Sequence, residues 1–115
     1  MTTEAKWKVG YQKEIERAIS SRKAGNEGMA RVCARRAAGI VIGEYLSRQG
    51  NTNLSNSTIE RISIFVTLPG MDDNNRDIAR HFLLKVNADR NLPNDVDLIS
   101  DNQWLVMNLL LENTD

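Results

Sequence analysis

The sequence predicts an all-α fold, a single-domain bundle of four to five helices that comprises residues 1–115. Apolar residues recur at helical spacing in several segments, and a very short turn at Gly25 and Asn26 separates two long helical patterns. A chain of 115 residues is also long enough for one hydrophobic core. We therefore expect an antiparallel hairpin of helices at about residues 3–24 and 26–48.

The first helix of this hairpin shows one apolar face. Its apolar residues are spaced by three and four positions, and they are Trp7, Tyr11, Ile15, Ala18 and Ile19. Arg22 and Lys23 lie in the expected last turn, where cations favour the helix dipole, and Gly25 follows them. These features place the end of the helix before Gly25.

The second helix is predicted to be the buried centre of the bundle. Asn26 is its expected N-cap, and Glu27 lies in its first turn. Apolar residues surround most of its circumference, which is typical of a buried helix. Many of its residues are small enough to let another backbone approach closely, and they are Ala30, Ala34, Ala37, Ala38, Gly39 and Gly43. Cys33 lies among them, so we expect a packed thiol and not a nucleophile.

Three shorter helices are expected after residue 50. Ser57 and Glu60 fit a capping box before residues 58–68, whose pattern suits either a helix or a strand. A helix is preferred because a lone strand would leave its backbone groups unpaired. The fourth helix is expected at about residues 74–87, capped by Asp72 or Asp73. Its expected buried residues are Ile78, Phe82, Leu83 or Leu84, and Val86.

The last helix is expected to begin at Asn94 or Asp95, after the Leu92-Pro93 pair. Asp95, Asp97 and Asp101 then lie near its positive end, where acidic side chains are stabilised. This explanation is preferred to a metal site, because one histidine and one cysteine match no zinc spacing. We expect neither a metal nor a cofactor.

Charge and cysteine content indicate a soluble cytoplasmic domain. Residues 1–50 contain ten Lys/Arg and five Asp/Glu, and residues 51–115 contain five and ten. The two halves can therefore attract each other, or the basic half can face an anionic partner. A single cysteine forms no internal disulfide, which favours a reducing compartment. The sequence contains no apolar run typical of a signal peptide or a membrane span.

Arg76 and His81 are the candidate catalytic residues. A histidine that acts as base near neutral pH and a cation that holds a phosphate are the parts needed for metal-independent RNA cleavage. Five positions on a helix turn through about 500°, which places the two side chains about 140° apart. Convergence therefore requires a distorted backbone or a second subunit, and a surface histidine is the simpler interpretation.

Arg31, Arg35 and Arg36 form the densest basic cluster of the chain. Arg31 and Arg35 lie on one helix face and repel each other unless an acid or a bound anion separates them. Glu27, one turn before Arg31, can supply that acid. A set of salt bridges is the preferred interpretation, and a phosphate-contacting or nucleic-acid-contacting patch is the alternative.

The chain resembles the HEPN superfamily of helical bundles. The resemblance rests on Glu14–Ala18, on Gly25–Gly28, on the alanine-rich stretch Ala34–Ala38 with Tyr45-Leu46, and on Leu92-Pro93, Asp97–Ile99 and Trp104-Leu105. It implies a dimeric bundle, which in many members pairs with a nucleotidyltransferase and in some is a ribonuclease with an Arg, four to six residues, then His. Arg76 and His81 match that spacing. Arg90-Asn91 is the alternative position, and because no histidine follows it, that alignment makes the chain a non-catalytic member.

These observations favour a non-catalytic cytoplasmic interaction module that forms a homodimer and has a possible nucleotidyltransferase-type partner. Self-association would use either the small-residue face of the central helix or an apolar face of the last helix. One alternative is an endoribonuclease that uses Arg76 and His81 on RNA, and another is a non-catalytic nucleic-acid-binding domain that uses Arg31, Arg35 and Arg36.

Overall fold

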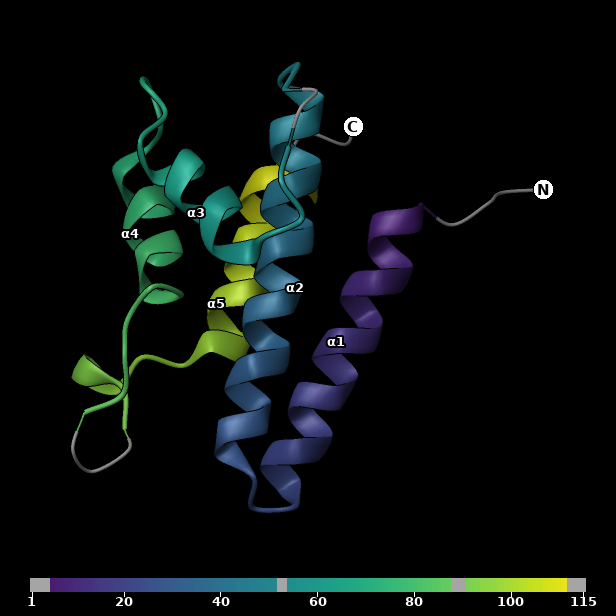
Figure 1. Ribbon diagram of the computed structural model, residues 1–115, viewed down its shortest axis with the longest axis vertical. Helices are drawn as coiled ribbons and strands as arrows, with labels where there is room; N and C mark the ends of the chain where they lie inside the picture. The colour runs from purple at the N-terminus through teal and green to yellow at the C-terminus, as the bar shows by residue number, and fades with distance from the viewer. Residues whose placement is uncertain (1–4, 52–53, 88–90, 112–115) are drawn as a thin grey trace.

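The computed structural model describes residues 5–51, 54–87 and 91–111 and confirms the all-α fold (Figure 1). Within these ranges there is no strand. The helices are α1 (Lys6–Lys23), α2 (Glu27–Arg48), α3 (Thr58–Val66), α4 (Asp73–His81) and α5 (Leu98–Leu105). A short 3-10 helix, η1 (Pro93–Asp95), precedes α5, and a π-helix, η2 (Val106–Leu111), continues it.

The predicted antiparallel hairpin is formed by α1 and α2, which meet at the turn through Gly25. Gly25 adopts a φ of 84°, a conformation that a residue with a side chain rarely takes. The side chain of Asn26 accepts a hydrogen bond of 3.0 Å from the amide of Met29, as expected of an N-cap. From this turn the two helices diverge toward the first residues of α1 (Figure 1).

Helix α2 is the centre of the bundle, with α1, α3 and α5 each packed against it (Figure 1). Its small residues let α3 approach the backbone closely. A Cβ atom added to Gly39 would lie 2.6 Å from Oγ1 of Thr58, and one added to Gly43 would collide with the guanidinium of Arg61. The part of the small-residue face around Gly39 and Gly43 is therefore covered within the chain by α3.

Residues 58–66 form a helix, which confirms the preferred interpretation of this ambiguous segment. The hydroxyl of Ser57 accepts a hydrogen bond from the amide of Glu60, so Ser57 is the N-cap. Ile62 and Phe65, three residues apart, are both fully buried. A helical spacing of apolar residues therefore determines the packing of this segment.

The fourth helix is shorter than the sequence predicts. It is capped by Asp72, which accepts hydrogen bonds from two amides, but it ends at His81 and not near residue 87. The carbonyl oxygens of Phe82 and Leu84 accept hydrogen bonds from the guanidinium of Arg35 on α2. These two carbonyl groups are therefore hydrogen-bonded without the backbone bonds that a longer helix would provide. Val86, expected to be buried, is 45% exposed.

The last helix begins later than predicted, because residues 93–95 form the separate turn η1. Asp95 has a φ of 55°, which a right-handed helix does not allow. Asp97 is the N-cap of α5, and its carboxylate accepts a hydrogen bond of 3.0 Å from the amide of Ile99. The expected start at Asn94 or Asp95 is therefore wrong by about one turn.

Asn102 is the one buried polar residue of the described core. Its side-chain amide donates hydrogen bonds of 2.8 Å to the carbonyl of Ala34 on α2 and 3.0 Å to that of Leu98. A buried amide that loses its partners is costly, so this bond favours one register of α5 against α2.

Candidate functional site

The structure places Arg76 at the junction of α3 and α4. Its guanidinium donates one hydrogen bond of 3.0 Å to the carbonyl of Leu68 and another of 3.1 Å to the carboxylate of Asp73. The Leu68 bond ties the first turn of α4 to the segment that follows α3. Arg76 therefore has a structural task that is independent of any ligand.

His81 lies at the other end of α4 and contacts α5. Its Nδ1 atom is 2.9 Å from Oδ2 of Asp101, and the two side chains are 31% and 13% exposed. Burial raises the pKa of Asp101 above its usual value of 3.8, although His81 acts in the opposite direction. The pair joins two helices that are distant in the sequence.

Arg76 and His81 are therefore directed to different neighbours within the chain. Arg76 bonds toward the end of α3, and His81 bonds to α5. General acid–base catalysis on RNA requires both groups within reach of one phosphate, and within one chain the bonds of these side chains do not provide that arrangement. The alternative position, Arg90, lies outside the described residues.

The basic cluster of α2 is divided among different tasks. Arg31 and Glu27 lie 4.0 Å apart across one helical turn, as the salt-bridge interpretation predicts. Arg35 is half-buried and donates hydrogen bonds of 3.2 and 3.0 Å to the carbonyls of Phe82 and Leu84. Burial lowers the pKa of Arg35, with a further contribution from the neighbouring charge of Arg31. Arg36 is exposed. Arg35 thus closes the end of α4 and is not available as part of a continuous phosphate-contacting patch.

An acidic and basic network that the sequence did not reveal joins the hairpin turn to α5. Arg22 binds two carboxylates, with distances of 2.8 Å to Glu27 and 3.1 Å to Asp97. Bonds to Arg22 lower the pKa of Glu27 below its usual value. For Asp97, burial alone would raise the pKa, but Arg22 and two backbone amides outweigh it and lower the pKa. The pair of Arg22 and Asp97 therefore joins the basic half of the chain, residues 1–50, to the acidic half, residues 51–115.

The last helix presents apolar side chains on two sides. Val106, Leu109 and Leu110 face the core and are at most 7% exposed. Three other side chains of the same helix are accessible: Trp104 is 41% exposed, Met107 63% and Leu111 37%. The neighbouring residues Leu105, Val106, Leu109 and Leu110 are buried, so these three side chains form the side away from the core, which we call the outer face. The indole nitrogen of Trp104 donates a hydrogen bond of 3.1 Å to Asn75.

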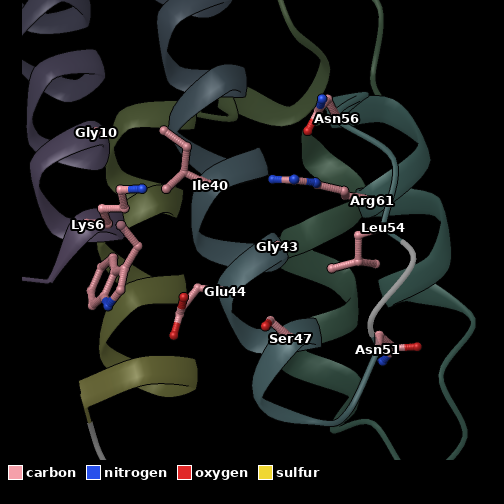
Figure 2. A pocket seen from close by; sticks show the side chains of 11 residues that line it. Lys6, Gly10, Ile40, Gly43, Glu44, Ser47, Asn51, Leu54, Asn56 and Arg61 are labelled. Atoms are coloured by element: carbon pink, nitrogen blue, oxygen red, sulfur yellow. The ribbon is translucent and has the colours of Figure 1, made fainter.

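A groove of about 820 Å³ opens on the surface of the described residues. It lies between the first half of α1, the second half of α2 and the segment that leads into α3 (Figure 2). Lys6 and Arg61 were not singled out as site residues from the sequence, although both line it. The Gly39–Gly43 spacing was the available signal, because it predicts a close neighbour of α2 but does not say which residue approaches.

Cys33 is fully buried, as predicted for a packed thiol. Within the described ranges, no three His, Cys, Asp or Glu side chains gather closely enough to hold a metal ion. Of the helices described, none is both long enough and apolar enough to span a membrane.

Comparison of the chain with protein-family models, with curated protein sequences and with solved structures gave no match. The resemblance to HEPN domains therefore stays a prediction, and the proposals below rest on the geometry of this chain.

Proposed function

We propose that this protein is a non-catalytic helical interaction module that forms a homodimer through the outer face of its last helix. The observation that carries the proposal is the exposure of Met107 (63%), Trp104 (41%) and Leu111 (37%) on one side of a helix whose opposite side is core. Exposed apolar side chains that cluster on one face are typical of interaction sites.

The packing of α2 supports this face over the other candidate. Self-association through the small residues of α2 would require access to Gly39 and Gly43. Thr58 and Arg61 already lie against these glycines. A second copy could reach them only by displacing α3, whereas the outer face needs no such rearrangement.

The absence of charge on the outer face favours a second copy of the same chain as the partner. Residues 102–111 include no Asp, Glu, Lys or Arg. In a symmetric dimer each patch meets itself, so a charged patch would bring like charges together. A neutral apolar face avoids this repulsion.

The engaged state of the catalytic candidates supports a non-catalytic role. Arg76 and His81 each form hydrogen bonds to a different part of the fold. Separately, the buried free thiol of Cys33 is compatible with a location in the cytoplasm. A nucleotidyltransferase-type partner, which the HEPN resemblance implies, stays a prediction.

The proposal is tested by the mass of the protein in sedimentation equilibrium at micromolar concentration. We expect the wild type to have twice the mass of the chain. We expect Met107→Glu to be a monomer, because a buried unpaired charge at the centre of an interface costs at least about 2 kcal/mol. Ile64→Glu is the matched control, since Ile64 is 38% exposed on α3, outside the outer face.

A monomeric wild type would contradict the homodimer. A dimer that dissociates equally in the Met107→Glu and Ile64→Glu variants would contradict the assigned face. Circular dichroism of each variant shows whether the helical fold is retained.

A further inference from the structure

The groove shown in Figure 2 is lined by two basic side chains, Lys6 and Arg61. It is open because α1 diverges from α2 toward its first residues (Figure 1). It is lined by α1, α2, α3 and the segment that leads into α3. The residues that matter here are Lys6, Trp7, Ile40, Gly43, Leu54 and Arg61.

Arg61 is a half-buried cation whose protein partners are neutral. Its Nε atom donates a hydrogen bond of 2.7 Å to the carbonyl of Ser55, and Nη1 donates one of 3.1 Å to the carbonyl of Gly39. Among the described residues Arg61 forms no salt bridge with a carboxylate, and its hydrogen bonds come from Nε and Nη1. Removing a charge from water without an opposite charge is unfavourable, so this site is suited to an anion.

Lys6 approaches the same region from the opposite wall. Figure 2 shows Lys6 reaching from α1 and Arg61 reaching from α3, both toward the part of α2 around Ile40. Within the described part of the chain Lys6 has no salt bridge. Glu44 is the acidic residue of the groove, but its carboxylate is held by Arg48 at 2.8 Å. Two cations thus face one space, while the nearby acid is already paired.

The lining of the groove also favours a ligand that has apolar surface in addition to negative charge. Gly43 leaves room for the guanidinium of Arg61 to lie over the backbone of α2, where a Cβ atom would collide with it. Trp7 of α1 and Leu54 of the segment that leads into α3 both line the groove and offer apolar surface. A volume of about 820 Å³ is in the range of sites that take small molecules.

We infer that the groove binds a small phosphate monoester that carries a flat ring, with the phosphate between Lys6 and Arg61 and the ring against Trp7. A phosphate dianion matches two cations, and arginine favours such an oxyanion because its guanidinium offers several donors in one plane. The inference is independent of the proposed dimer, because the groove and the outer face involve different residues.

The test is calorimetric titration of the protein with phenyl phosphate at low ionic strength. We expect saturable binding of one molecule per chain. Lys6→Gln is expected to weaken this binding about tenfold, as the loss of one charge-assisted hydrogen bond predicts. Lys23→Gln removes the same charge from an exposed position at the far end of α1, and it should bind as the wild type does.

Arg61→Lys gives a second and independent reading, because it keeps the charge but not the planar group. We expect it also to weaken binding about tenfold. Its fold is checked by circular dichroism, since Arg61 also bonds to Gly39 and Ser55. If this variant does not fold, Lys6→Gln with its Lys23→Gln control decides the question alone.

Two further ligands test the chemistry of the site. We expect inorganic phosphate, which lacks the ring, and benzoate, which lacks the dianion, each to bind more weakly than phenyl phosphate. Equal binding of inorganic phosphate would contradict the role of the ring, and equal binding of benzoate would contradict the preference for phosphate. Absence of saturable binding, or equal weakening by Lys6→Gln and Lys23→Gln, would overturn the site.

Discussion

Nδ1 of His81 lies 2.9 Å from Oδ2 of Asp101, and this contact joins the end of α4 to α5. This pair of titratable groups links two helices that are also joined by the hydrogen bond from Trp104 to Asn75. The contact also occupies the histidine that the sequence offered as a catalytic base. Because the pKa of Asp101 is raised, this carboxyl also makes the stability of the fold depend on pH.

Replacing Asp101 by Asn should change how stability depends on pH. Burial raises the pKa of Asp101 above 3.8, so the folded protein binds this proton more tightly than the unfolded chain. The stabilisation that this tighter proton binding gives to the folded protein is fully present below pH 3.8. It is lost as the pH rises through the raised pKa of Asp101. We therefore expect the free energy of unfolding of Asp101→Asn, relative to that of the wild type, to increase between pH 3 and pH 7. Urea unfolding at several pH values measures this difference, and a difference that is constant over this range would contradict it.

The Arg22 network should show the opposite dependence. The pKa values of Glu27 and Asp97 are lowered, so their contribution is present above their usual values of 4.5 and 3.8 and is lost as pH falls. We expect Arg22→Met to cost about 0.5–1 kcal/mol at pH 7, as for partly exposed ion pairs, and much less at pH 2. Thermal unfolding at both pH values measures it. Arg80→Met is the control, because the Arg80–Asp77 pair is more exposed and lies within one helix.

Gly39 should be intolerant of a methyl group. A Cβ atom there would lie 2.6 Å from Oγ1 of Thr58, so we expect Gly39→Ala to destabilise the protein by about 1–3 kcal/mol. The double variant Gly39→Ala with Thr58→Ala should recover part of this loss, since the closest atom is removed. Unfolding free energies in urea give both values.

Gly28 is the matched control for this prediction. It also lies in α2, but the nearest atom to an added Cβ is 3.8 Å away. Gly28→Ala should therefore leave stability unchanged or raise it by up to about 1 kcal/mol. Equal losses for the two alanine variants would contradict the role of the contact with α3, because helix propensity alone favours alanine over glycine.

The sequence was sufficient to predict the fold class, the hairpin and the central position of α2. These features follow from local periodicity, from Gly25 and Asn26 at the turn, and from the small residues of α2. The segment 58–66 was also predicted correctly, because a lone strand could not have satisfied its backbone. Such inferences need no knowledge of which helices meet.

The errors arose where a distant contact decides the local structure. Helix α4 ends early, just before the residues Phe82 and Leu84, whose carbonyl oxygens accept hydrogen bonds from Arg35. Periodicity within residues 74–87 contains no information about Arg35. The same applies to Arg61, whose position over Gly43 depends on the packing of α3 against α2.

The candidate site was predicted less well than the fold. Arg76 and His81 match a catalytic spacing, but each is bonded within the chain to a different element. The sequence left two faces open for self-association, and only the packing of α3 on Gly39 and Gly43 distinguishes them. A helix that is apolar on two sides is visible in the sequence, whereas the side that remains exposed is not.

The measurement that tests the central proposal most directly is an isotope-filtered NMR experiment on a mixed sample of labelled and unlabelled chains. It detects only contacts between protons of different copies. We predict contacts from the ε-methyl group of Met107 in one copy to the outer face of its partner. Contacts between copies that involve α1 or α3 and never Met107, or no such contacts at concentrations where the protein is fully folded, would contradict the proposed interface.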